Sequence, residues 1–208
     1  MRTDRSRYAM LVMEVNHIAR ETKFDREKAL SQAMLVFWKK GYEAASVPDL
    51  LQAMGLSRSS LYNTFGDKRS LFLEAIRLYQ QQTAFRQQIL NNATSAKAGI
   101  AEYFRQRIDA AYSENRPKGC LITNTAIEMN TPDEELKKLI KERFTSLEAS
   151  FCRLLAKGRQ SGEIKDTADI RALACLLLNL NHSINIMAKV NMERQQIEQM
   201  VQTVMNSF

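Results

Sequence analysis

Three glycines, Gly41, Gly55 and Gly66, divide residues 25–79 into four stretches and so limit the length of any element there. Glycine readily adopts the left-handed conformation that ends a helix. The first stretch repeats apolar residues at three- and four-residue intervals, as an amphipathic helix does: Ala29, Leu30, Ala33, Met34, Phe37 and Trp38. The spacing predicts a helix over 25–40, two helices of about two turns each, and a longer fourth helix.

The starts of these helices are marked by residues that cap helix N-termini. Ser46, with Asp49 three positions later, forms a capping-box pattern. Ser57 precedes the third stretch and Asp67 precedes the fourth, and both residue types are preferred N-caps. Two short helices that meet at a tight turn near Gly55, between longer helices, are typical of a helix-turn-helix.

The remaining sequence is also helical in pattern, so we expect an all-α fold of about nine helices. With only 7 Gly and 3 Pro and no sustained alternation of apolar and polar residues, β structure is disfavoured. The fourth helix is expected to reach about residue 90, and further helices are expected over 98–113, 120–130, 133–160, 169–189 and 193–207. The expected organisation is an N-terminal extension, a helix-turn-helix domain and a C-terminal helical domain, at 1–24, 25–72 and 73–208.

The net charge of +7 and the pI near 9.4 favour a polyanionic partner, such as nucleic acid or an anionic membrane surface. A soluble protein that is basic without such a partner fits the same values. No apolar run reaches the ~18 residues of a membrane helix, and the three cysteines lack metal-binding spacing. We expect a cytoplasmic protein with free thiols that needs no metal and no cofactor and does not associate with a membrane.

One continuous part of the chain resembles the TetR-type family of bacterial transcriptional repressors: Ala29 through FWKKGYEAASVPDLLQAMGLSRSSLYNTFGDKRSLF. The matching features are a first helix that ends in F…GY, Ser46 before an apolar helix, the segment GLSRSSLYNTF, and DKRSLF at the start of the fourth helix. The resemblance implies a regulator that binds double-stranded operator DNA as a homodimer. It also implies that the C-terminal helices form the dimer and bind a small effector.

The third stretch carries the residue types that read DNA. Leu61 and Phe65 lie four positions apart and can anchor its short helix inward. Arg58 can then fork to guanine and Asn63 to adenine in a major groove, while Lys68 suits a phosphate. Serine and tyrosine hydroxyls suit phosphates or base edges. The full set of expected DNA contacts is Ser46, Arg58, Ser59, Ser60, Tyr62, Asn63 and Lys68.

The basic start of the chain, MRTDRSR, has two interpretations. It is either an arm that enters a minor groove through Arg2, Arg5 and Arg7, or a disordered tail. The sequence leaves both open.

Two apolar stripes near the C-terminus support a dimer independently of the resemblance. Their members recur at helical spacing and are Leu173, Leu176, Leu177, Leu180, Ile184 and Met187, followed by Ile197, Met200, Val201, Val204 and Met205. Two such helices that meet their counterparts would form a four-helix interface. The alternative is that both stripes pack inside one chain.

The helices between residues 98 and 188 are long enough to enclose an effector pocket. Its expected lining is Phe104, Ile108, Tyr112, Ile122, Ile127, Leu147, Phe151 and His182. Each of these residues is equally compatible with ordinary core packing.

Cys120 is a candidate sensor because it follows a glycine at a helix start, near Arg116 and Lys118. A helix N-terminus and nearby cations lower the pKa of a thiol and raise its reactivity. The GCL segment also resembles a subset of the family in which such a cysteine responds to electrophiles or oxidants, and Lys189 resembles a lysine that lies near it. A small buried apolar residue is the alternative reading of Cys120.

Other function classes find little support. There is no Ser-His-Asp order, no recognisable carboxylate pair and no P-loop, so we do not expect an enzyme. His17 and His182 lack ligand spacing, which disfavours a metal sensor. A helical adaptor that binds other proteins would account for the helices, but it would not account for the polar third helix.

Overall fold

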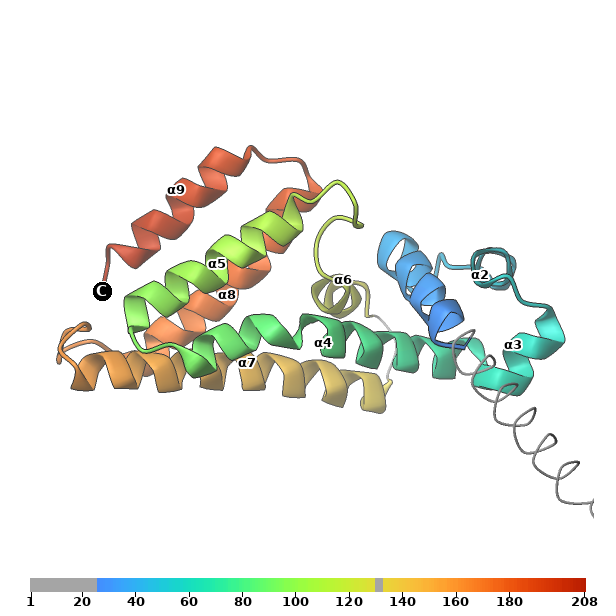
Figure 1. Cartoon of the computed structure of the whole chain (residues 1–208), viewed down its shortest axis with the longest axis horizontal. Coiled ribbons are helices and arrows are strands. Elements are labelled where there is room, and N and C mark those ends of the chain that lie inside the picture. Colours follow the sequence, from blue (N-terminus) through green and yellow to red (C-terminus); the bar gives the residue numbers. More distant parts are fainter. Residues whose placement is uncertain (1–25, 130–132) are drawn as a thin grey trace, which may run out of the picture. The chain divides into compact units, whose positions relative to one another are not determined.

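The computed structural model describes residues 26–129 and 133–208, and all regular structure within them is α-helical (Figure 1). The predicted all-α fold is therefore confirmed for the described chain. The predictions for the extension at 1–24, including the arm through Arg2, Arg5 and Arg7, concern residues outside the described ranges. No helix in the described part is long and apolar enough to cross a membrane.

The described chain forms two compact units, one that ends at Leu78 and one that begins at Tyr79. The first unit contains the helical residues 26–40, α2 (Val47–Met54), α3 (Arg58–Phe65) and the beginning of α4 (Lys68–Asn92). The second unit contains the remainder of α4 and the helices α5 (Ala96–Ala111), α6 (Leu121–Glu128), α7 (Glu134–Gln160), α8 (Ile170–Lys189) and α9 (Arg194–Met205).

The short helices of the first unit begin and end where the sequence predicts. Ser46 forms a capping box with Asp49, and Ser57 accepts a hydrogen bond from the amide of Ser60 at 3.1 Å. Gly55 ends α2 with a φ of 66°, in the left-handed region that favours glycine. These caps satisfy amide groups that a two-turn helix cannot satisfy internally.

The first unit is held together by an aromatic cluster. The ring centroids of Phe37 and Phe72 lie 4.8 Å apart, and those of Tyr42 and Phe72 also lie 4.8 Å apart. Leu50 and Leu61 are fully buried and bring α2 and α3 to the same core. Burial of these side chains fixes the two short helices, since isolated helices of this length are unstable in water.

In the second unit α7 packs along α8, and α5 contacts α7, α8 and α9 (Figure 1). Tyr103, Phe104 and Phe151 form an aromatic core, with Tyr103 in edge-to-face contact with both phenylalanines. The helix boundaries differ from the prediction by one or two residues. Helix α5 begins at Ala96 rather than 98 because Ser95 caps it, and α4 continues to Asn92.

Candidate nucleic-acid interface and effector cavity

Helix α3 presents one buried and one exposed side. Leu61 is fully buried and Phe65 is buried, as the four-residue spacing predicts. Arg58, Ser59, Tyr62 and Asn63 are exposed, together with Thr64, while Ser60 is half-buried. Arg58 lies over the ring of Tyr62, with its guanidinium carbon 5.9 Å from the ring centroid. The outward row therefore combines a guanidinium, a phenol and an amide on a rigidly anchored helix.

Three serine hydroxyls at the start of α3 form a local network. The hydroxyl oxygen of Ser57 lies 3.0 Å from that of Ser59 and 2.8 Å from that of Ser60. A hydroxyl both donates and accepts hydrogen bonds, so these groups can be rearranged toward a phosphate without leaving an unpaired donor. Because the serine side chains are small, the backbone of the first turn of α3 can approach a DNA strand closely.

The two predicted phosphate contacts outside α3 already have partners. Ser46 donates to Asp49 at 2.7 Å, and a salt bridge of 2.7 Å joins Lys40 to Asp49. Lys40 and Ser46 together lower the pKa of Asp49 to about 2. Lys68 donates to the carbonyl of Glu43 at 3.4 Å, and its ammonium lies 4.6 Å from the ring centroid of Tyr42. These contacts hold the ammonium in a fixed position.

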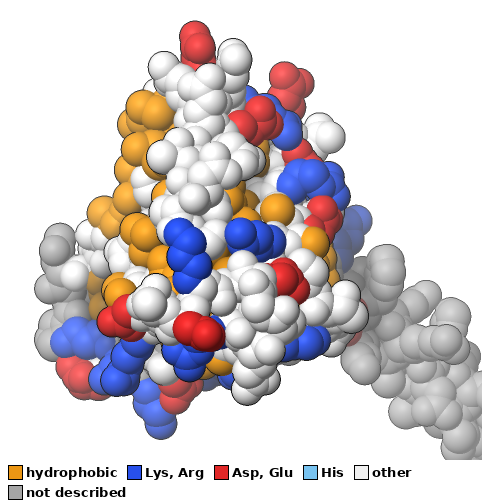
Figure 2. All heavy atoms as spheres, turned by 90° about the vertical axis from the view of Figure 1, so that its left-hand side faces the viewer, with side chains coloured by type: hydrophobic (Ala, Val, Ile, Leu, Met, Phe, Trp, Pro, Cys, Tyr) orange, Lys and Arg blue, Asp and Glu red, His pale blue; other side chains and the backbone are white. Residues whose placement is uncertain are grey.

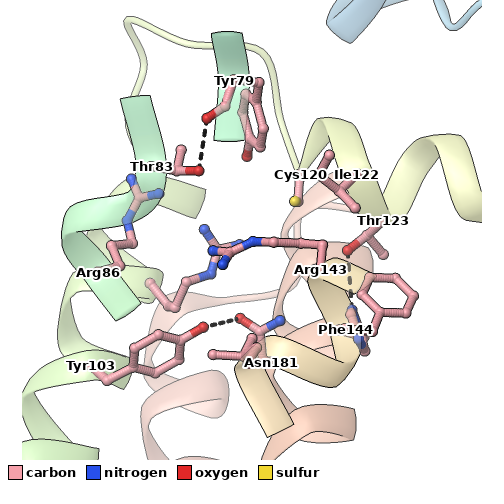
Figure 3. A pocket seen from close by; sticks show the side chains of 13 residues that line it. Tyr79, Thr83, Arg86, Tyr103, Cys120, Ile122, Thr123, Arg143, Phe144 and Asn181 are labelled. Atoms are coloured by element: carbon pink, nitrogen blue, oxygen red, sulfur yellow. Dashed lines mark hydrogen bonds between the residues drawn. The ribbon is translucent and has the colours of Figure 1, made fainter. Parts of the chain in front are cut away.

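The second unit contains a small cavity that is partly open to solvent (Figure 3). Its wall is contributed by five helices, α4 to α8, and by the residue that precedes α6. The lining residues are Tyr79, Thr83, Arg86, Tyr103, Arg107, Cys120, Ile122, Thr123, Arg143, Phe144, Leu147, Asn181 and His182. The cavity is thus mixed, with hydroxyl, amide, guanidinium and apolar groups, as is usual for small-molecule sites.

Cys120 lies in the wall of this cavity, directly before α6 (Figure 3). Burial opposes its ionisation, but the positive charge of Arg107 and hydrogen bonds from Tyr79 and Thr123 outweigh burial and lower the pKa of the thiol. Gly119 precedes it with a φ of 82°, and a Cβ at this position would lie 3.1 Å from the side-chain oxygen of Asn124. The turn before Cys120 is therefore restricted to glycine.

His182 lies in the same wall. Its Nδ1 is 3.1 Å from the hydroxyl of Thr123, and its ring centroid is 4.3 Å from that of Phe144. Burial, and then the charge of Arg107, lower the pKa of the imidazole. Its buried Nε2 has no hydrogen-bond partner among the described residues. The ring is therefore neutral near pH 7, with one nitrogen unused.

Two family descriptions match the chain. Residues 29–75 match the bacterial regulatory proteins of the tetR family, and residues 96–204 match the tetracyclin repressor-like C-terminal domain. The chain belongs to the tetR family of bacterial regulatory proteins. It is a helix-turn-helix transcriptional regulator that binds DNA.

Two curated relatives of this tetR-family chain match it over most of their length. The uncharacterised transcriptional regulator YezE of Bacillus subtilis (strain 168) is 34% identical, over 87% of this chain and 94% of that protein. The transcriptional repressor ComR of Escherichia coli (strain K12) is 28% identical, over 88% of each chain.

A solved structure provides a similar fold with DNA bound. It contains a cysteine mutant of the TetR family regulator CifR in complex with 26-base-pair double-strand operator DNA. The sequence identity is 30% and the TM-score is 0.79, over 86% of this chain and 95% of that chain.

The predicted effector residues of this tetR-family chain fall in different places. Cys120 and His182 line the cavity, whereas Phe104 and Phe151 are fully buried in the aromatic core and are not among its lining residues. Tyr112 is half-buried and donates a hydrogen bond to the carbonyl of Met192. Lys189 is exposed in the last turn of α8. Their roles toward an effector stay predictions.

Three arginines in the cavity wall were not predicted from the sequence: Arg86, Arg107 and Arg143. A signal for two of them was present. Arg86 occupies one position of a buried stripe at intervals of four, three and four residues: Tyr79, Thr83, Arg86 and Leu90. Arg107 occupies the same position in a second stripe: Ile100, Phe104, Arg107 and Ala111. An arginine in the register of an apolar stripe indicates a buried cation.

The described residues contain no group of three His, Cys, Asp or Glu side chains arranged to hold a metal ion.

Proposed function

We propose that two copies of this chain bind one operator, with α3 of each copy in the major groove of a half-site. The observation that carries the proposal is the exposed row on α3 above two buried anchors. In this arrangement Arg58 and Asn63 read base edges, since their side chains match guanine and adenine. The helix-turn-helix geometry spaces the two half-sites about one DNA turn apart.

The remaining predicted contacts position the protein on the DNA backbone. Lys68 is held near the start of α4, and Ser46 starts α2, so both suit phosphate contacts that carry no sequence information. Ser59, Ser60 and Tyr62 supply hydroxyls for phosphates or base edges. The proposed division is therefore Arg58 and Asn63 for base edges, Lys68 and Ser46 for phosphates, and three hydroxyl residues for either.

A homodimer is supported by exposed apolar side chains on α8 and directly after it. Leu176, Ile186 and Val190 are exposed, and half-buried Leu173 and Met187 lie on the same helix. Figure 2 shows hydrophobic side chains gathered along the side of the molecule where the chain ends. Other members of the predicted stripes, Leu177, Leu180, Ile184, Ile197 and Val201, are buried within the chain's own core and are not available for an interface.

In the proposed mechanism the protein represses transcription until a small effector enters the cavity or Cys120 is modified. Either event changes the packing of α4 to α8 around the cavity and releases the operator. Support comes from the place of Cys120 in the cavity wall and from its lowered pKa, because the thiolate is the reactive form. We assign DNA binding to a domain at 25–72. Effector binding and dimerisation are assigned to a second domain at 73–208.

We propose that the protein regulates transcription in the cytoplasm, and we assign no catalytic reaction to it. The match to bacterial regulatory proteins supports this assignment.

A gel shift tests operator recognition. The DNA is the region upstream of the chain's own gene, and a scrambled fragment of equal length is the control. The double variant Arg58→Ala, Asn63→Ala is expected to lose specific binding at physiological salt, whereas Arg105→Ala, an exposed arginine on α5, retains it. Unchanged binding by the double variant would contradict the assignment of α3.

A second experiment separates the two release routes. The operator complex is treated with an electrophile, and Cys120→Ser is compared with Cys175→Ser, since Cys175 is an exposed thiol elsewhere on the chain. Release that persists in Cys120→Ser but is lost in Cys175→Ser would exclude Cys120 as the sensor.

A further inference from the structure

The cavity wall contains three arginines and no acidic side chain. Arg86 is 6% exposed and Arg107 is 5% exposed, so both guanidiniums are almost completely removed from water. Arg143 is half-buried beside them. Because arginine stays protonated in proteins, the wall holds three positive charges. Buried charges are normally paired, because desolvation of an ion is costly.

The partners that these arginines do have are neutral. Arg107 donates to the side-chain oxygen of Asn185, and Arg143 donates to that of Gln87. Arg86 forms no salt bridge among the described residues, and its guanidinium carbon lies 4.9 Å from the ring centroid of Phe85. Among the described residues, the buried Nε atoms of Arg86 and Arg107 have no hydrogen-bond partner. The cavity wall therefore carries unbalanced positive charge, and two of its arginines have an unpaired donor.

Within the wall, one group can supply a negative charge. The Cys120 thiolate faces Arg107, and the pKa of Cys120 is lowered. Burial raises the pKa values of Tyr79 and Tyr103, so both phenols are neutral near pH 7. Neutral His182 supplies no negative charge. Even with a thiolate present, at least two of the three guanidinium charges lack an opposite charge.

We propose that the cavity binds a small organic carboxylate, which is held by Arg86, Arg107 and Arg143. This inference rests on the proposed function, because it names the chemical class of the effector. Guanidinium groups pair with carboxylates through two parallel hydrogen bonds. The carboxylate would supply the missing negative charge.

The rest of the wall favours an organic acid over an inorganic anion. Ile122, Phe144 and Leu147 line the same cavity and offer an apolar surface for the carbon skeleton. Figure 3 shows Arg143 in the middle of the site, with Cys120 above it and Tyr103 and Asn181 below. A ligand with one charged end and an apolar remainder matches both kinds of wall. Sulfate or phosphate would match only the arginines.

Occupation of the cavity has a chemical consequence for Cys120. A carboxylate beside Arg107 competes with the thiolate for the same positive charge. Near a bound anion the thiolate is less favoured, because like charges disfavour ionisation. The two proposed release routes are thus coupled, and an occupied cavity contains a less reactive thiol.

The test uses the full chain without DNA and measures ligand binding by calorimetry and by thermal shift. The probes are butyrate, benzoate and succinate, each paired with its uncharged amide, together with sulfate and phosphate. We expect at least one carboxylate to bind, with its amide at least about tenfold weaker, since bonds to charged groups contribute that much. Equal binding of acid and amide, binding of no carboxylate, or binding of sulfate or phosphate alone would overturn the proposal.

Variants test the role of the arginines in the same assays. Arg86→Gln and Arg143→Gln are expected to weaken carboxylate binding at least about tenfold. The matched control is Arg105→Gln, on α5 two residues from Arg107, whose side chain is exposed and paired with Glu102 and Asp109. Full binding by both cavity variants would overturn the assignment. If one variant fails to fold, the other variant and the acid and amide pairs on the natural chain still decide.

A reactivity measurement supplies an independent readout. Saturating carboxylate is expected to slow the alkylation of Cys120 several-fold relative to its amide, while the alkylation of Cys175 is unchanged. Operator release is then scored separately. Carboxylate binding without release would leave the anion site in place and contradict the effector function. Release by neutral compounds alone, with no carboxylate bound, would contradict the anion site and leave the effector function in place.

Discussion

Arg58 and Arg86 carry the same charge in opposite surroundings. Arg58 is exposed on α3, in contact with water and with the ring of Tyr62. Arg86 is buried in the second unit, with an Nε that has no partner. Neither forms an ion pair with an acidic side chain in the described chain. On the proposed function, both regions accept an anion from outside the protein: the first binds a polymer and the second binds a small molecule.

The largest expected difference between the two regions is in how strongly salt concentration changes their affinity for a ligand. If each dimer makes six to ten phosphate contacts, operator affinity should fall by about a thousand-fold or more between 50 and 200 mM salt. Carboxylate affinity should change by no more than about threefold, because buried pairs are screened weakly. Fluorescence anisotropy with labelled operator and calorimetry with the acid measure the two slopes. Equal slopes would indicate that the cavity arginines are open to solvent.

A core substitution in α3 should lower the stability of the first unit more than that of the second. Leu61 is fully buried, and Leu61→Ala is expected to cost about 2–5 kcal/mol in the free energy of unfolding of the first unit. DNA binding should be lost because the recognition helix is no longer held. Carboxylate binding in the second unit should persist at temperatures where that unit remains folded. Loss of both activities together would show that the two units unfold as one.

Within the first unit, replacing either of two cationic residues should affect DNA binding in different ways. Arg58→Ala is expected to cost about 1–3 kcal/mol for the operator and little for other DNA, because the side chain reads bases. Lys68→Ala should weaken all sequences about equally and reduce the salt slope by about one. Titrations of operator and scrambled DNA at several salt concentrations measure both. Equal loss on scrambled DNA for Arg58→Ala would assign Arg58 to the backbone.

Within the second unit, the pKa of the Cys120 thiol should depend on the buried positive charge of Arg107. The thiolate of Cys120 forms as the pH rises through its pKa, and Arg107 holds that pKa low. The alkylation rate of the natural chain should therefore reach half its maximum at a lower pH than that of an ordinary cysteine. Arg107→Gln should move this midpoint upward, whereas Arg105→Gln should not. A midpoint that stays in place would remove Arg107 as the cause.

The first unit could be predicted closely because its signals are local. Ser46, Ser57 and Asp67 mark helix starts, and each accepts the hydrogen bond expected of a cap. Gly55 and Gly66 both have positive φ. The anchors on α3 follow from spacing alone. The exposed polar row of α3 can be predicted from the sequence because the two buried anchors in the same helix define which side faces the core.

The cavity was harder to predict because it depends on contacts between distant segments. Cys120 and His182 were found from residue type and setting, but their neighbours come from three other helices. Arg86 and Arg107 were missed because arginine in a helix is normally exposed. Nothing in the sequence near Arg86 indicates that Arg107 lines the same cavity. Similarly, the apolar stripes of α8 and α9 could not show which members the chain itself buries.

The contact between Arg107 and Asn185 has an evolutionary consequence. Asn185 differs from aspartate by one side-chain group, and a single nucleotide change converts one codon into the other. Asn185→Asp would give Arg107 a permanent counter-ion from within the protein. A regulator altered in this way would have lost part of its need for an external acid. If the cavity binds an acid as proposed, the response of this chain to that acid depends on an amide, rather than a carboxylate, at position 185.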